Sequence, residues 1–137
     1  MIVPGYSGTP LARKLGIKPG ALVLIIDAPA EYAAWLGELP DGARLTCEAP
    51  PGHADLVHLF APSLAVLDQG LLLGRTAMRI DGALWVSWPK KASKVATDVT
   101  ENLVRARALA TDLVDMKICA VSEVWSGLKL VVRRALR

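Results

Sequence analysis

Short apolar runs alternate with amphipathic segments along the chain. Runs such as LVLII at 22–26 contain almost no polar alternation, which is typical of strands covered on both faces. Six strands are predicted, over residues 21–27, 43–48, 54–61, 81–88, 116–121 and 128–134. Helices are predicted between them, over residues 10–15, 30–37 and 64–78 and from residue 98 onward.

The order of these elements predicts an α/β domain. Strand and helix alternate until the last two strands, which indicates a mostly parallel sheet with right-handed crossovers. Residues 123–127 are too few for a crossover helix, so the last two strands should be antiparallel neighbours. The length of 137 residues suits one domain, 1–137, in which residues 1–16 form an N-terminal arm and a short helix.

Helix-capping residues support two of the helices. Thr9 can cap the first helix, with Pro10 at its first position. Ser63 can cap the third helix, although Gly70 and Gly74 weaken it.

The last helix is predicted to begin at Asp98. Glu101 follows three residues later, which is the spacing of a capping box. One face of this helix should lie on the sheet, formed by Val99, Leu103, Ala106, Ala110 and Leu113.

Composition excludes several classes of protein. Hydrophobic residues make up 53% of the chain, so a sizeable core can form, yet no apolar run approaches the roughly 18 residues of a membrane span. No secretion signal is recognisable at the start. Cys47 and Cys119 are the only cysteines, so neither a disulfide framework nor a zinc site is expected. We therefore expect a cytoplasmic protein without a metal and without a membrane partner.

Charge is distributed unevenly along the sequence. Residues 1–70 hold four Lys/Arg and seven Asp/Glu, a net charge of −3; residues 71–137 hold twelve and six, a net charge of +6. A basic half can attract anionic ligands or nucleic acid. Aromatic residues make up only 5%, which gives no stacking platform for bases, so the sequence does not favour nucleic-acid binding.

Three segments resemble strands of the class I methyltransferase fold. KLGIKPGALVLIID (14–27) is similar to the entry into its first strand, ADLVHLFAPS (54–63) to its fourth and DGALWVSWPK (81–90) to its fifth. The resemblance spans residues 10–133, with one strand and one helix missing in the middle. It implies a three-layer, Rossmann-like sheet of six strands in the order 2-1-3-4-6-5, with the last strand antiparallel.

Three blocks resemble a small bacterial family whose domain has no assigned function. They are GYSGTPL (5–11), GALWVSWPKKAS (82–93) and WSGLK (125–129). This resemblance implies no activity.

The methyltransferase resemblance implies a site for S-adenosylmethionine after the first strand. Asp27 matches the acid of the family pattern there, but Pro29 and Glu31 stand where the pattern has glycines. Proline removes an amide donor, and Glu31 adds bulk and negative charge. Glu48 matches the acid that would hold ribose hydroxyls. Asp27 and Glu48 are thus the cofactor-binding candidates if any transferase activity survives.

A basic loop at the carboxyl end of the predicted fourth strand is a candidate anion site. Ligands of open α/β sheets bind at this edge. Lys90, Lys91 and Lys94 offer ammonium groups, and Ser93 and Thr97 offer hydroxyls. The alternative is a solvated loop whose lysine stems cover apolar surface.

Further candidates lie near the same edge. Trp85 and Trp88 should face opposite sides of their strand, and Trp88 either packs in the core or contacts a ligand. Trp125, placed in the connection before the last strand, could close a pocket or anchor a partner. In the N-terminal arm, Tyr6, Ser7 and Thr9 could arch over the strand ends; this set completes the candidates.

Nucleophilic and metal chemistry find little support. His58 lies inside a predicted strand and should be a buried, hydrogen-bonded ring, and Cys119 should be inert packing. Cys47, near a strand end, has no histidine or asparagine that singles it out.

Two functional hypotheses remain open. The favoured one is a non-catalytic module that binds an anionic small molecule or a protein at the carboxyl edge of its sheet, without a cofactor. The other is a divergent transferase, which uses S-adenosylmethionine or another group donor. The exposed edge of the second strand also makes a homodimer plausible.

Overall fold

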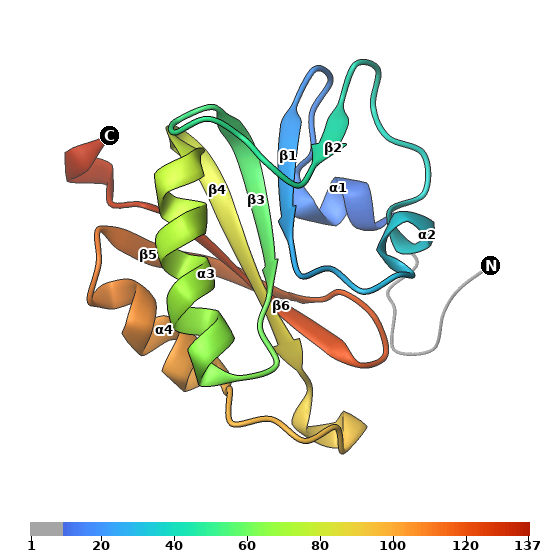
Figure 1. The fold of residues 1–137 in the computed structure, drawn as a ribbon, viewed down its shortest axis with the longest axis vertical. Helices are drawn as coiled ribbons and strands as arrows, with labels where there is room; N and C mark the ends of the chain where they lie inside the picture. The colour runs from blue at the N-terminus through green and yellow to red at the C-terminus, as the bar shows by residue number, and fades with distance from the viewer. Residues whose placement is uncertain (1–9) are drawn as a thin grey trace.

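The computed structural model describes residues 10–137 (Figure 1). Its elements in chain order are α1 (Leu11–Leu15), β1 (Leu22–Ile26), α2 (Tyr32–Leu36), β2 (Arg44–Thr46), β3 (Ala54–Phe60), α3 (Leu64–Ala77), β4 (Met78–Pro89), the 3-10 turn η1 (Lys91–Ser93), α4 (Glu101–Leu109), β5 (Leu113–Ala120), β6 (Trp125–Val132) and η2 (Arg134–Leu136).

One six-stranded sheet runs through the domain in the order β2-β1-β3-β4-β6-β5. β1 pairs in parallel with β2 and β3, and β3 with β4. β6 is antiparallel to both β4 and β5. The predicted fold class and strand order are therefore confirmed, and β2 is an edge strand as expected.

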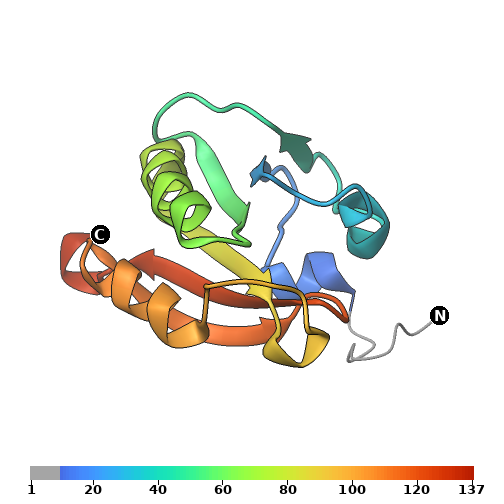
Figure 2. The same ribbon diagram turned by 60° about the horizontal axis from the view of Figure 1, so that its bottom comes forward.

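Helices cover the sheet unequally. Buried side chains of α3 and α4 form a core on one face with Val57, Leu84 and Leu128, among others. The opposite face carries a second core, to which only the short α1 and α2 contribute helical side chains. In Figures 1 and 2, α1 and α2 lie toward the β1 side of the sheet, and α1 reaches β5 only at its end, where Lys14 Nζ donates to the Ala120 carbonyl (3.0 Å). Part of the second face is therefore covered by no helix.

Alternation along β4 places its tryptophans as the sequence predicts. Trp85 is fully buried in the core beneath α1, and its indole N–H donates to the Leu15 carbonyl (3.0 Å). Trp88 belongs to the core on the α3 side.

The ends of α1 and α3 follow their local signals. Gly16 takes the left-handed conformation that ends α1 (φ 81°), and the Ser63 hydroxyl accepts from the Val66 amide at the start of α3. Pro10 is the N-cap of α1 rather than its first helical residue. Thr9 lies outside the described residues, so its predicted capping role is not addressed.

The predicted start of the last helix is wrong. Thr100 is the N-cap of α4, and its hydroxyl accepts from the Leu103 amide. Asp98 instead accepts from the Leu64 amide (2.8 Å) and so satisfies a free N–H in the first turn of α3.

The predicted buried face of this helix is also wrong in part. Val104 and Ala108 are its buried residues, whereas Ala106 and Ala110 are exposed. Leu113 is buried, but as the first residue of β5. The predicted face failed because it treated residues 99–113 as one helix, whereas α4 ends at Leu109 and Leu113 already belongs to a strand, in which side chains alternate with a period of two.

Candidate functional site

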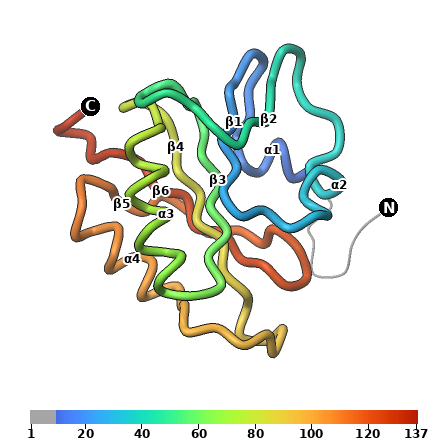
Figure 3. Tube along the Cα trace, in the orientation of Figure 1, coloured from blue at the N-terminus to red at the C-terminus, as the bar shows by residue number. Residues whose placement is uncertain are grey.

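The predicted site residues that the structure describes lie at the carboxyl edge of the parallel strands. Asp27 follows β1, Glu48 follows β2, and the basic loop 90–97 follows β4. This loop projects beyond the sheet, in gold at the bottom of Figure 3. Trp125 pairs with Pro89, and the Lys90 amide donates to the Val124 carbonyl (2.6 Å), so the WSGLK block begins beside the loop. Tyr6, Ser7 and Thr9 lie outside the described residues.

Internal hydrogen bonds already use the hydroxyls of the basic loop. The Ser93 hydroxyl donates to the Lys90 carbonyl (2.6 Å), and the Thr97 hydroxyl donates to the Pro62 carbonyl (2.6 Å). Each hydroxyl oxygen also accepts a hydrogen bond from a backbone amide: Ser93 from the amide of Val95, and Thr97 from the amide of Val99. An anion at this loop would therefore meet ammonium groups of exposed lysines, without hydroxyl donors in support.

The two tryptophans at this edge are packed against the protein. Trp88 is 5% exposed and lies in the α3-side core. Trp125 is the first residue of β6, not part of the connection as predicted. Its half-buried ring meets Phe60 edge-on, with ring centroids 5.0 Å apart. Neither ring stands free over the strand ends.

The turn after β1 does not fit S-adenosylmethionine in the way the methyltransferase pattern requires. Asp27 has a left-handed backbone (φ 57°) without being glycine. Pro29 offers no amide donor, and its carbonyl accepts from the Tyr32 amide as α2 begins. Asp27 and Glu48 are exposed. The acids of the pattern are present, but the glycine cradle is absent, so no reaction step is derived through this cofactor.

Aromatic packing fills the space beside that turn. Tyr32 is buried, and its ring meets His58 and Phe60 edge-on at 5.1 and 5.3 Å. Phe60 in turn stacks on His58 (4.3 Å) and touches Trp125. These rings are part of the core that links α2 to the sheet.

A buried hydrogen-bonded chain crosses the same region. His58 Nδ1 bonds to the Tyr32 hydroxyl (2.7 Å) and Nε2 to the Ser87 hydroxyl (2.7 Å). Burial lowers the pKa of His58 to about 3 and raises the pKa of Tyr32. The prediction of a buried, hydrogen-bonded His58 is confirmed. Because His58 and Ser87 have no exposed surface, no substrate reaches this chain, and its role is structural.

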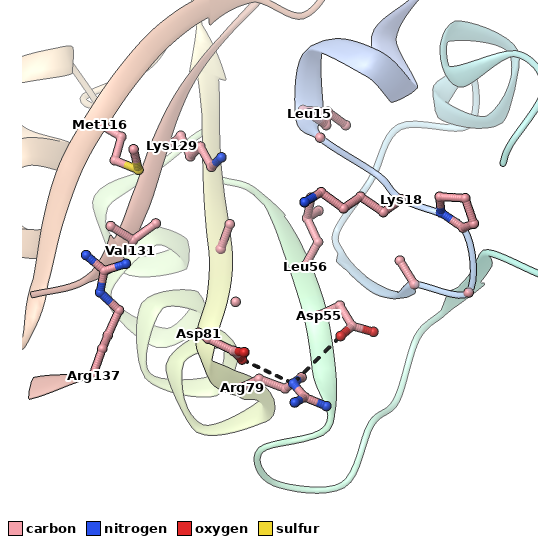
Figure 4. A pocket seen from close by; sticks show the side chains of 16 residues that line it. Leu15, Lys18, Asp55, Leu56, Arg79, Asp81, Met116, Lys129, Val131 and Arg137 are labelled. Atoms are coloured by element: carbon pink, nitrogen blue, oxygen red, sulfur yellow. Dashed lines mark hydrogen bonds and ion pairs between the residues drawn. The ribbon is translucent and has the colours of Figure 1, made fainter. Parts of the chain in front are cut away.

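A cavity of about 570 Å³ lies at the opposite end of the strands, where β3 and β4 begin (Figure 4). The loop after α1 forms one wall and β6 the other. Lys18 and Lys129 extend into it from these two walls (Figure 4). We call it the lysine cleft; its other lining residues are Leu15, Gly16, Pro19, Gly20, Ala21, Asp55, Leu56, Arg79, Asp81, Gly82, Ala83, Met116, Val131 and Arg137.

The lysines in and beside the cleft have no carboxylate partner in the described part of the chain. Lys117 of β5 stands directly opposite Lys129 of β6 in the antiparallel pair. Burial, and then the charges of Lys117 and Lys18, lower the pKa of Lys129. Within residues 10–137 no ion pair joins Lys18, Lys117 or Lys129 to an acid. Three ammonium groups thus share one region without neutralisation.

The acidic end of the cleft is paired internally. Arg79 lies 3.2 Å from Asp81 and 3.8 Å from Asp55 (Figure 4). Asp55 also accepts from the Leu22 amide. Asp55 and Asp81 thus share the guanidinium of Arg79, and Arg137 also lines the cleft, whereas no ion pair in residues 10–137 joins Lys18 or Lys129 to an acid.

Sequence reasoning did not find this site. In the sequence Lys129 is only the last residue of the WSGLK block, and no motif contains Lys18 or Lys117. One signal was available: Lys129 interrupts the apolar run LKLVV, where a half-buried charge needs a reason. The pairing of Lys129 with Lys117 depends on register between strands, which the sequence does not display.

Among residues 10–137, no three His, Cys, Asp or Glu side chains gather where they could hold a metal ion. No helix in that range is long and apolar enough to cross a membrane.

Comparison with known proteins identifies the fold. A SAM dependent methyltransferase from Aquifex aeolicus superposes with a TM-score of 0.58 at 11% identity, over 88% of this chain and 87% of that one. A ribosomal protein L11 methylase from Lactobacillus delbrueckii subsp. bulgaricus gives a TM-score of 0.54 at 12% identity, over 90% and 76% of the two chains.

Sequence comparison identifies no related family or curated protein: no family model and no curated protein matches the chain. The resemblance of the three blocks to a small bacterial family therefore stays a prediction. At these identities, the structural likeness establishes a methyltransferase-like α/β fold and nothing about activity.

Proposed function

We propose that this domain is a non-catalytic binding module on a methyltransferase-like frame, and that it binds an anionic small molecule in the lysine cleft. The observation that carries the proposal is the group of lysines 18, 117 and 129, which lack carboxylate partners among the described residues.

Like charges opposite one another on neighbouring strands destabilise a sheet. Lys117 and Lys129 have this arrangement, and burial makes the charge of Lys129 less favourable still. A bound anion would offset both the repulsion between Lys117 and Lys129 and the unfavourable burial of the Lys129 charge. Ionisable groups whose pKa is shifted are also frequent in the clefts of functional sites. The cleft is also within the roughly 300–1,000 Å³ range of small-molecule sites.

The basic loop at the carboxyl edge is the weaker location for an anion. Its hydroxyls are committed to the backbone, and Lys91 and Lys94 are exposed. An anion held there would interact with solvated ammonium groups alone, which contribute little in water. Binding at this edge stays a prediction.

A thermal-shift experiment tests the proposal. Inorganic phosphate, sulfate and citrate are titrated against the native chain at low ionic strength, since a ligand that binds only the folded state raises Tm. The variants are Lys18→Gln and Lys129→Gln, and the matched control is Lys91→Gln, which removes the same charge from the loop. The shift should occur in the native chain and the control and be lost in the cleft variants. The absence of a shift with all three anions, or its loss in the control alone, would contradict the proposal.

A divergent transferase is the second candidate. It is supported by the methyltransferase-like frame and by the exposed acids Asp27 and Glu48 after neighbouring parallel strands. S-adenosylmethionine would then raise Tm, and Asp27→Asn and Glu48→Gln would abolish the rise. No effect of S-adenosylmethionine on Tm at millimolar concentration would remove this candidate.

A further inference from the structure

The lysine cleft is larger than a simple inorganic anion, and part of its lining is apolar. Its volume of about 570 Å³ equals that of about twenty water molecules at roughly 30 Å³ each. We propose, on the basis of the proposed function, that its ligand is an amphipathic anion. A carboxylate or phosphate-ester head group lies between Lys18 and Lys129, and a hydrocarbon or aromatic body lies along Met116 and Val131.

The apolar wall is one argument for this ligand class. Leu15, Leu56 and Ala83 contribute buried side chains to the lining, and Val131 continues this wall on β6. Met116 lies at the side of the cleft and is 60% exposed. A methionine side chain adapts its shape to apolar ligands. An anion with an apolar body would cover Met116, whereas a bare oxyanion would leave it in water.

The strand geometry supplies a second argument. The pairing of β5 with β6 shifts register between Asp115 and Lys117, so Met116 has no partner on β6. Such a bulge redirects a side chain and is frequent beside binding sites. Here it places an exposed thioether on the cleft next to the Lys117–Lys129 pair.

Charge orients the ligand within the cleft. The lysine end attracts the head group, whereas Asp55 and Asp81 lie together beside Arg79 at the other end. Met116 lies level with Lys129, away from Asp55 and Asp81, and Val131 lies nearby with Arg137 (Figure 4). A head group at the lysines therefore lets the apolar body lie along Met116 and Val131 rather than against the two carboxylates.

Calorimetric titration with matched probes tests the inference. The probes are acetate, butanoate, hexanoate and octanoate below their aggregation concentrations, with octylamine as the cationic control. Each added methylene that becomes buried should lower Kd roughly threefold or more, until the apolar wall is covered. Octylamine should not bind measurably.

Two variants separate the head-group contact from the apolar contact. Lys129→Gln should abolish binding of every carboxylate. Met116→Ser should leave acetate binding unchanged and reduce the gain from acetate to octanoate severalfold. Leu72→Ser is the matched control, because Leu72 is 72% exposed on α3 and does not line the cleft, so it should bind like the native chain.

The outcomes distinguish the inference from the proposed function. If all carboxylates bind equally and need Lys129, the apolar part is wrong and the anion site stands. If no carboxylate or phosphate binding depends on Lys18 or Lys129, the proposed function itself is wrong. Equal binding of octanoate and octylamine, or an equal loss of chain-length dependence in Leu72→Ser, would overturn the inference in favour of nonspecific hydrophobic binding.

Discussion

The two ends of the parallel strands differ in how their polar and aromatic groups are used. At the carboxyl end, Tyr32, Phe60 and Trp125 interlock, and the hydroxyls of the loop 90–97 bond to the backbone. At the amino end, Lys18 and Lys129 face a cavity, and no acid of residues 10–137 pairs with either. The edge where ligands of such folds usually bind is packed as a core, and the opposite edge holds the open, unneutralised charge.

This difference teaches that position in a fold does not by itself locate a site. A binding site needs groups whose interactions are incomplete within the protein. The carboxyl edge has largely satisfied its groups, whereas the lysine cleft has not.

Phe60→Ala should have the largest effect. Phe60 is fully buried between Tyr32, His58 and Trp125, so its removal should destabilise the domain by about 3–5 kcal/mol. Urea unfolding measures the change, with Met116→Ala in the lysine cleft as comparison, expected within about 0.5 kcal/mol of native. A tolerated Phe60→Ala would mean that the carboxyl edge is not a packed core.

Acidification should destabilise the domain through His58. Well above pH 6.5 the His58 ring is neutral in both the folded and the unfolded state. Below pH 6.5 His58 becomes protonated in the unfolded chain, whereas in the folded chain its pKa is about 3 and the ring stays neutral. The free energy of unfolding should therefore fall as pH falls from 6.5 to 4.5, by about 2 kcal/mol at most.

The control for this pH dependence is the other histidine. His53 is exposed, so His53→Gln should retain the slope, whereas His58→Gln should remove it while lowering stability at every pH. Unfolding in urea at several pH values measures both. If the free energy of unfolding still falls with pH in His58→Gln, other titratable groups cause the pH dependence.

Lys129→Met should stabilise the ligand-free domain slightly. Methionine keeps an apolar stem and removes the charge opposite Lys117, so a gain of about 0.5 kcal/mol is expected at low salt. Because salt screens such repulsion, the gain should shrink near 1 M NaCl. Lys91→Met should show no gain. A loss of stability in Lys129→Met at low salt would indicate that the lysine charge is already neutralised.

Removal of the loop lysines should have the smallest effect. The triple variant of Lys90, Lys91 and Lys94 to glutamine should bind phosphate within about twofold of the native chain, a difference of roughly 0.4 kcal/mol. Calorimetric titration measures this at low ionic strength. A tenfold loss would return the anion site to the carboxyl edge.

Much of the fold could be predicted because its signals are local or nearly so. The continuous apolar runs identified the central strands, and the short connection before β6 required an antiparallel pair. The opposite facing of Trp85 and Trp88 follows from strand geometry alone. Ser63 and Gly16 cap their helices through neighbours in sequence.

Glycines in α3 show where local reasoning was incomplete. Gly70 and Gly74 count against a helix by propensity, yet both lie inside α3. A Cβ at Gly70 would collide with Leu59, and one at Gly74 would lie 2.9 Å from Leu84. Their role is to let α3 approach β3 and β4 closely, and only packing reveals that requirement.

The candidate site was harder to predict than the fold. Lys90, Lys91 and Ser93 attracted attention because they are adjacent in sequence, but adjacency also lets a loop satisfy its own hydrogen bonds. Lys18, Lys117 and Lys129 are scattered along the chain, so nothing in the sequence indicates that Lys18 and Lys129 share one cleft and that Lys117 stands opposite Lys129.

By itself, the sequence determined the order of strands and helices, the parallel and antiparallel pairing, and the two-faced burial of the sheet. These depend on side-chain periodicity and connection length, which act over a few residues. Only the tertiary structure decided that Asp98 caps α3 rather than α4, and that Lys129 stands opposite Lys117 over an open cleft. Those features depend on register and packing between segments that are distant in sequence. Register and packing determine which polar groups pair within the protein and which remain available to a ligand.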